Sequence, residues 1–152
     1  MKKQIWISAL GAVLAVTGIL PAASPVDTYA ADSENTVFIN EIESDDPDGG
    51  NDWVEIINAG STAVDISGWF VTDDKGLERL TEDKTWGIAE GTVLEAGAVL
   101  VLEDSIDFDF GLGKEDTDSL YDGSSAQMDS YTYAGHAAGT YSRVPDGTGN
   151  FV

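Results

Sequence analysis

The sequence predicts an all-β domain built as a two-sheet β-sandwich. Two tryptophan-centred segments, residues 52–58 and 65–73, place an indole among β-branched neighbours, which suits a half-buried strand. Turn residues recur about every ten positions along the rest of the chain, with short β-rich segments between them. After residue 30 no segment shows a sustained 3.6-residue apolar period with caps, so we expect little or no helix.

Turn residues separate the expected strands. Pro47 and two glycines exclude a helix from the segment 44–51, and the Gly-Ser-Ser sequence at 123–125 has the composition of a hairpin turn. Residues 91–103 hold a short strand, a turn and a longer strand that is apolar enough to lie centrally in a sheet. The expected β segments are residues 36–42, 52–58, 65–73, 91–103, 107–110, 118–122, 127–133 and 140–144.

The N-terminus has the pattern of a secretory signal peptide. Two lysines after Met1 precede an uncharged segment whose apolar part spans residues 5–20, and a Thr-Tyr-Ala sequence ending at Ala30 suits cleavage. An uncleaved membrane anchor is the alternative, but the apolar run is shorter than the roughly 20 residues of a spanning helix. We therefore expect a secreted or cell-surface protein with no membrane span after cleavage. The expected division is a signal peptide over 1–30, a flexible lead over 31–35 and a β-sandwich over 36–152.

The chain is strongly acidic, with 28 aspartates and glutamates, seven lysines and arginines, and a formal net charge of −21. Cleavage after Ala30 would leave 27 acidic and five basic residues and a net charge of −22. This charge repels phosphate backbones and anionic lipids, so nucleic acid is not an expected partner, whereas cations and basic surfaces are. It also serves the simpler purpose of keeping a secreted protein soluble. The absence of cysteine excludes disulfide bonds and thiol chemistry.

The C-terminal segment breaks off at the start of an apolar stretch. A proline and glycine turn follows Arg143 and Val144, and Phe151 and Val152 then resume a β-like pattern. We expect that the sandwich is truncated at its C-terminal end and that the chain is a fragment of a longer protein.

Several short motifs occur in a characteristic order along the chain. They are Asn40-Glu41-Ile42, residues 52–58, residues 64–69, residues 91–94 with 98–101, Phe110-Gly111-Leu112-Gly113, and residues 129–131 with 141–149. In this order they resemble the lamin tail domain, in its secreted bacterial type. Each motif is weak by itself, but six in register over about residues 37–152 make the resemblance specific.

The resemblance implies an immunoglobulin-like β-sandwich, a module first known from nuclear lamins and also found in secreted bacterial proteins. In bacteria such a module is an accessory unit attached to secreted hydrolases or repeated in surface proteins. The family has no established catalytic residues to carry over. Nuclear partners do not transfer, since this chain has an export signal and carries no coiled coil or basic tail. The segment 83–88 matches the family only loosely, and the family commonly continues past Val152.

An acidic loop is the main candidate for a metal site. Asp45, Asp46, Asp48 and Asp52 could supply the six to eight oxygen ligands that Ca²⁺ prefers, although the loop lacks EF-hand spacing because Ile57 occupies the closing position. A solvated turn is the alternative interpretation. A second and weaker candidate set comprises Glu115, Asp116, Asp118 and Asp122.

Catalysis is not expected from this chain. Carboxylates are so abundant that some pair will always have a separation suitable for glycoside hydrolysis, which makes the pairing uninformative. His136, the only histidine, is flanked by glycine and alanine and is interpreted as part of a loop. We expect Trp53 and Trp69 to be at least partly buried, whereas Trp86 lies in a loop segment where an exposed aromatic ring could contact a partner.

Together these observations predict a secreted, noncatalytic binding or tethering module that uses a sandwich face, a loop end or an exposed edge strand. Its expected partner is a protein or polysaccharide at the cell surface. The alternative is an accessory N-terminal domain of a longer secreted hydrolase, a nuclease or phosphoesterase, whose catalytic part lies beyond residue 152. No cofactor is expected apart from Ca²⁺ at the acidic loop.

Overall fold

The computed structural model describes residues 34–152. The expected signal peptide and its cleavage site, together with residues 31–33 of the expected lead, lie outside the described residues. Within residues 34–152 there is no helix with the length and apolar character needed to span a membrane.

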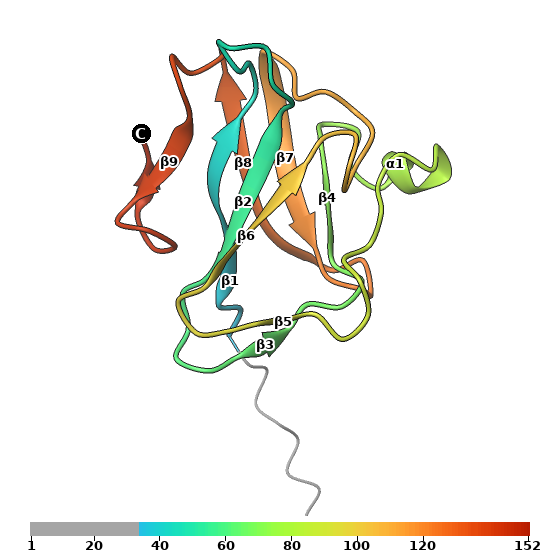
Figure 1. The fold of residues 1–152 in the computed structure, drawn as a ribbon, viewed down its shortest axis with the longest axis vertical. Helices are drawn as coiled ribbons and strands as arrows, with labels where there is room; N and C mark the ends of the chain where they lie inside the picture. Colours follow the sequence, from blue (N-terminus) through green and yellow to red (C-terminus); the bar gives the residue numbers. More distant parts are fainter. Residues whose placement is uncertain (1–33) are drawn as a thin grey trace, which may run out of the picture. The chain divides into compact units, whose positions relative to one another are not determined.

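The described chain is built from antiparallel strands and one short helix (Figure 1). The elements are β1 (Val37–Glu43), β2 (Trp53–Asn58), β3 (Val64–Asp65), β4 (Phe70–Thr72), α1 (Glu78–Thr81), β5 (Val93–Leu94), β6 (Val99–Glu103), β7 (Glu115–Tyr121), β8 (Gln127–Ala134), β9 (Tyr141–Val144) and β10 (Asn150–Phe151). Five strands form one sheet in the order β10-β9-β1-β2-β6, three form a second in the order β4-β7-β8, and β3 pairs with β5. The all-β prediction is confirmed, and the layers are consistent with an immunoglobulin-like sandwich.

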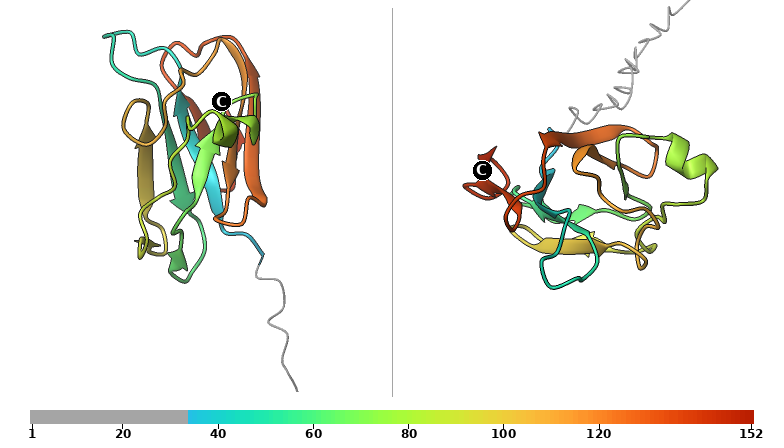
Figure 2. Two further views of the ribbon diagram at one scale, coloured as in Figure 1. Left: turned by 90° about the vertical axis from the view of Figure 1, so that its right-hand side faces the viewer. Right: turned by 90° about the horizontal axis from the view of Figure 1, so that it is seen from above.

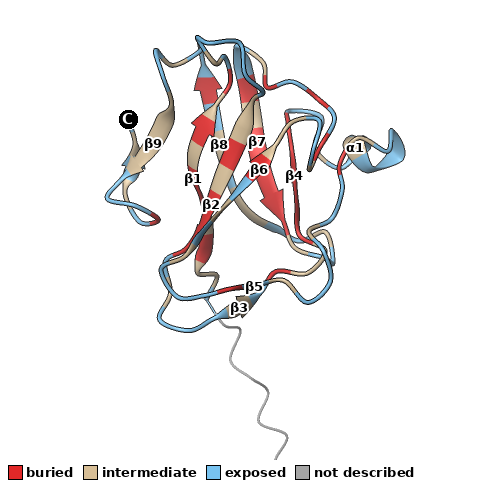
Figure 3. Ribbon diagram, in the orientation of Figure 1, coloured by how far each residue is buried: buried red, intermediate tan, exposed pale blue. Residues whose placement is uncertain are grey.

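The core lies between the two larger sheets, which face each other in the view from above (Figure 2). Ile39, Val54 and Ile56 line it from the five-stranded sheet, and Val71 and Leu120 line it from the three-stranded sheet. Each of these side chains is at most 2% exposed. Burial of each stabilises the fold by about 1.5–3 kcal/mol. Buried positions alternate with half-buried ones over much of β1 and at the start of β2, whereas all three residues of β4 and the last four of β7 are buried (Figure 3).

The two tryptophan-centred segments fold differently. Residues 53–58 form the single strand β2, as expected, and Trp53 is partly buried. The expected strand over 65–73 is instead divided into β3 and β4, because Gly68 turns the chain with a φ of +73°. Trp69 therefore lies just outside a strand, yet it is only 8% exposed. The predicted burial of both indoles is confirmed, whereas the prediction of a continuous second strand is wrong.

The remaining local predictions are mostly confirmed. The only helix in the described part of the chain is the four-residue α1, and the predicted hairpin is formed by β7 and β8 around the turn at 123–125. Residues 107–110 do not form a regular strand. Phe108 makes isolated bridges to Thr85 and Asp104, and its ring stacks on that of Phe110 with centroids 4.6 Å apart.

The expectation that the apolar segment 98–103 lies centrally in a sheet is wrong. It forms β6, which is the edge strand next to β2. Leu100 and Leu102 face the core, but Val99 and Val101 point outward and are 49% and 46% exposed. A continuous apolar run is typical of a strand covered on both faces. Here one half of that run is left at the surface.

The last two strands close the five-stranded sheet. β9 pairs with β1, and β10 pairs with β9, so the β-like pattern at Phe151 is realised as a short strand. Arg143 in β9 connects the two sheets, because it donates to the main-chain oxygen of Ile39 at 2.7 Å and to the carboxylate of Asp129 in β8 at 2.8 Å. These contacts hold the C-terminal hairpin against the sandwich.

Candidate binding site

The acidic loop between β1 and β2 does not bring its four aspartates together. Asp45 and Asp48 are exposed, and an oxygen of Asp46 accepts a hydrogen bond from the Asp48 main-chain N–H at 2.7 Å, which closes a local turn. Asp52 points toward the sandwich, where its carboxylate accepts the Leu112 N–H at 2.6 Å. Burial, opposed by this hydrogen bond, raises the pKa of Asp52.

Calcium binding by this loop stays a prediction. Within residues 34–152 no three Asp, Glu or His side chains form a group that could hold a metal ion, so binding would require the loop to rearrange. If Ca²⁺ is a ligand, the melting temperature should rise with Ca²⁺ and rise much less with an equal concentration of Mg²⁺. Thermal unfolding in each salt measures this, and equal shifts or no shift would exclude the site.

The second candidate set is divided between two faces of β7. Glu115 is exposed, whereas Asp116 and Asp118 share the inward face, 7% and 0% exposed. Asp122 lies beyond the strand, where its carboxylate accepts hydrogen bonds from Ser124 and from the Ala126 N–H in the hairpin turn. The set is therefore not one cluster of ligands. Its two inward members are part of a buried group that the sequence did not reveal.

Three buried aspartates, Asp73, Asp116 and Asp118, lie near one another where the end of β4 pairs with β7. Asp116 is well satisfied, since its carboxylate accepts main-chain N–H groups from residues 74, 113 and 117 at 2.6–2.8 Å. Asp73 forms two hydrogen bonds with the guanidinium of Arg79. Burial opposes ionisation of Asp73, but the hydrogen bonds from Arg79 outweigh burial and leave its pKa below the ordinary value.

Asp118 has no such support. Both of its carboxylate oxygens are buried and lack a hydrogen-bond partner within residues 34–152. The Tyr133 hydroxyl lies near this carboxylate but forms no well-aligned hydrogen bond with it. Burial, followed by the charges of Asp116 and Asp73, raises the pKa of Asp118 well above its ordinary value. The strand alternation of β7 was the only signal in the sequence that could have located this group.

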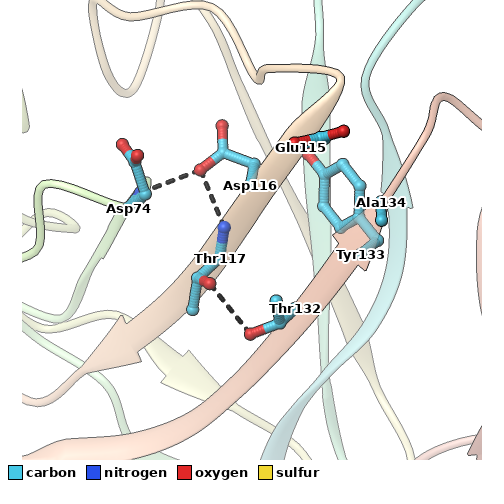
Figure 4. A pocket seen from close by; sticks show the side chains of 7 residues that line it. All are labelled: Asp74, Glu115, Asp116, Thr117, Thr132, Tyr133 and Ala134. Atoms are coloured by element: carbon cyan, nitrogen blue, oxygen red, sulfur yellow. Dashed lines mark hydrogen bonds between the residues drawn. The ribbon is translucent and has the colours of Figure 1, made fainter.

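An open pocket of about 320 Å³ lies beside the buried aspartates (Figure 4). Its polar lining is Asp74, Glu115, Asp116, Thr117, Thr132 and Tyr133. The two threonine hydroxyls hydrogen-bond each other at 2.8 Å, and Asp116 is fully occupied by main-chain donors. Asp116 and the two threonines are therefore engaged, whereas the Tyr133 hydroxyl has no hydrogen-bond partner within residues 34–152.

His136 and Ser44 form the only hydroxyl–imidazole contact in the described part of the chain, with 3.0 Å between Oγ and Nδ1. Ser44 is only 5% exposed, and Asp52 forms no hydrogen bond with His136. A nucleophile buried in this way has no access to a substrate, so the pair does not form a catalytic triad. Trp86 is 40% exposed in its loop, as expected from its position.

A second surface is formed by the outer face of β1, β2 and β6, on the side away from the core. Cross-strand pairing aligns its residues in rows, since directly paired residues share a face. The rows are Glu43–Trp53–Glu103, Glu41–Glu55–Val101 and Phe38–Ile57–Val99. We refer to these nine residues as the outer face. It combines four glutamates with two well-exposed valines.

The four glutamates of the outer face have no cationic partner within residues 34–152. They accept hydrogen bonds from neutral donors instead: Glu41 from Thr140 and Ser142, Glu43 from Trp53, Glu55 from Asn40, and Glu103 from Asn51. The basic side chains that form ion pairs do so elsewhere, and these pairs are Lys75–Glu82, Arg79–Asp73, Arg79–Glu82, Lys84–Asp109 and Arg143–Asp129. The outer face is therefore left with negative charge.

Comparison with known proteins gives one finding for this architecture. Residues 30–135 match the protein family described as Lamin Tail Domain, which agrees with the order of motifs along the chain. No curated protein matches the sequence.

Proposed function

The chain belongs to the lamin tail domain family, and on this basis we propose that it is a secreted, noncatalytic module that binds a cationic partner through the outer face of β1, β2 and β6. The family is one of noncatalytic immunoglobulin-like domains, which favours binding over catalysis. Secretion rests on the signal-peptide pattern of residues 1–30. The partner is a basic protein segment or a cationic polymer at the cell surface.

The observation that carries this proposal is the pairing of Glu41 with Glu55 on adjacent strands. Like charges directly opposite each other in a sheet are destabilising, and no lysine or arginine in residues 34–152 forms an ion pair with either carboxylate. Neutral hydrogen bonds hold both side chains in place. A bound cation would relieve this repulsion, so the face is better suited to the bound state than to the free one.

The proposal is tested with a short peptide of alternating lysine and valine. We expect it to bind the wild-type domain with an affinity that falls as salt is added. The Glu41→Gln/Glu55→Gln variant keeps the hydrogen-bond acceptors but removes both charges. It should bind the peptide about tenfold more weakly, because the loss of two partly exposed ion pairs with the peptide costs about 1.4 kcal/mol of binding free energy. Isothermal titration calorimetry measures both affinities.

The matched control is Glu78→Gln/Glu115→Gln, which removes the same charge from α1 and β7, outside the five-stranded sheet. It should change the affinity by no more than about twofold, since exposed charges beyond a Debye length are screened. Equal losses in the two variants would show that the peptide senses only the net charge, and the proposed face would then be wrong.

A further inference from the structure

The edge of β6 presents main-chain groups that no other part of residues 34–152 uses. The main-chain N–H of Asp104 donates to the main-chain oxygen of Asp52 at 2.9 Å, and the main-chain N–H of Asn58 donates to the main-chain oxygen of Ala98 at 3.0 Å. The main-chain groups of the even-numbered residues from 98 to 104 therefore face β2. In an antiparallel ladder the residues between them direct their N–H and C=O groups away from the partner strand. Val99, Val101 and Glu103 therefore form the edge.

The loop after β6 occupies one end of this edge. The main-chain N–H of Glu103 donates to the Asp107 carboxylate at 3.0 Å, and the main-chain oxygen of Glu103 accepts the N–H groups of Ile106 and Asp107. No hydrogen bond within residues 34–152 involves the edge-facing groups of Val99 or Val101. Two N–H and two C=O groups thus remain available, in a regular strand, beside two exposed valine side chains.

Before Glu103, where the loop begins to cover it, this edge lacks the features that usually protect one. Edge strands in soluble proteins are commonly very short, or carry lysine, proline or a bulge, or are covered by other segments. β6 has the sequence VLVLE, with regular pairing to β2 throughout. At an edge of the other sheet, β8 is engaged in part: Asn35 donates to the main-chain oxygen of Met128 at 3.0 Å, and the side-chain carboxylate of Asp129 accepts the Ile39 N–H at 3.0 Å.

We propose that β6 binds its partner by strand addition, with an extended basic segment pairing along Val99 and Val101. This proposal rests on the proposed function and adds how the partner is held. Main-chain hydrogen bonds would supply affinity, and alternate side chains of the added strand would lie on the same side as the outer face. Lysine or arginine at those positions would approach Glu55 and Glu103, which carry no ion pair in residues 34–152.

Charge decides the choice of occupant. A second copy of this chain could offer an identical edge, but it would bring another strongly negative net charge, −22 after signal cleavage, and place glutamates against glutamates. An extended basic segment satisfies both the unused main-chain groups and the negative outer face. The occupant is therefore a strand of opposite charge from a different protein.

The experiment compares two peptides of alternating lysine and valine, one ordinary and one N-methylated on alternate residues along the edge that would pair with β6. N-methylation keeps the charge and side chains but removes the main-chain donors. We expect the N-methylated peptide to bind about tenfold more weakly, the effect of losing one or two main-chain hydrogen bonds. Because the domain itself is unchanged, this comparison does not depend on the folding of a variant.

Two variants test the same contact from the side of the domain. Val101→Pro removes the edge-facing N–H of residue 101. An edge strand tolerates proline at such a position, and the variant should bind the ordinary peptide about tenfold more weakly. Val101→Thr keeps the N–H and the branched side chain and should bind within about twofold of wild type. Circular dichroism and thermal unfolding check that both variants are folded.

The outcomes separate the mode of binding from the function. If the two peptides bind equally and only charge matters, strand addition is wrong while the cationic partner stands. If neither peptide binds, the proposed function fails together with strand addition. If the domain alone dimerises and the dimer is lost in Val101→Pro, the occupant is a second copy and the proposal of a basic partner is overturned.

Discussion

Replacing Arg79 by methionine is expected to lower the free energy of unfolding by about 3–5 kcal/mol. Arg79 and Asp73 form a largely buried ion pair, with side chains 11% and 5% exposed. Removal of the guanidinium would leave the Asp73 carboxylate buried near two further aspartates, Asp116 and Asp118. It would also remove the cation–π contact with Phe110, whose ring centroid lies 4.8 Å from the guanidinium carbon. Urea denaturation measures the loss without adding salt.

Two comparisons show whether the loss comes from an uncompensated charge. Lys84→Met removes a cation from the solvent-exposed pair with Asp109 and should cost at most about 1 kcal/mol. The double variant Arg79→Met/Asp73→Asn removes both charges and should regain much of the loss caused by Arg79→Met alone. A single variant as stable as the double one would contradict this explanation.

Replacing Asp118 by asparagine is expected to stabilise the domain at neutral pH by about 1–3 kcal/mol, a gain rather than the usual loss on changing a buried polar residue. The wild-type carboxylate is fully buried and its two oxygens lack partners in residues 34–152. An amide of the same shape carries no charge, so the substitution removes the repulsion between this position and the neighbouring carboxylates of Asp116 and Asp73.

The pH dependence gives a second readout of the same group. The pKa of Asp118 is raised in the folded state, so the folded protein holds a proton that the unfolded chain releases near pH 4. The stability contributed by this group is therefore present below the unfolded pKa and falls as the pH rises through the folded pKa. Asp118→Asn should remove this decline, and its advantage over wild type should grow from mildly acidic to neutral pH.

Urea denaturation of both proteins across this pH range measures the difference. Carboxylates remote from Asp118, such as Asp65 with its lowered pKa, make the free energy of unfolding rise with pH to the same extent in both proteins and cancel in the comparison. If Asp118→Asn were less stable than wild type at neutral pH, the carboxylate would have a favourable partner in solution, and the interpretation of Asp118 as uncompensated would be wrong.

The sequence was sufficient to predict the sandwich because short segments rich in β-branched and aromatic residues recur along it and the turns between them carry glycine or proline. The β7–β8 hairpin and the burial of Trp69 follow from such local signals. Gly68 shows where local patterns mislead, since a tryptophan among β-branched residues suggested one strand where a positive φ produces two.

The features that define the candidate site depend on which strands become neighbours, and a single sequence does not determine this. The apolar run of β6 predicts a central strand, and only the sheet order shows that it is an edge. The repulsive pair Glu41 and Glu55 arises from cross-strand register. Similarly, the abundance of acids concealed Asp118, because burial rather than composition distinguishes it from the exposed carboxylates around it.

The most direct test of the account is amide hydrogen exchange of the domain, measured by NMR, with and without the alternating lysine–valine peptide. In the free domain the Val99 and Val101 amides should exchange rapidly, since no group in residues 34–152 accepts their N–H. With the peptide bound, we predict that protection rises most at these two amides. Protection confined to the acidic loop at residues 45–52, or to the pocket beside Glu115, would contradict the assignment of binding to the outer face and edge of β6.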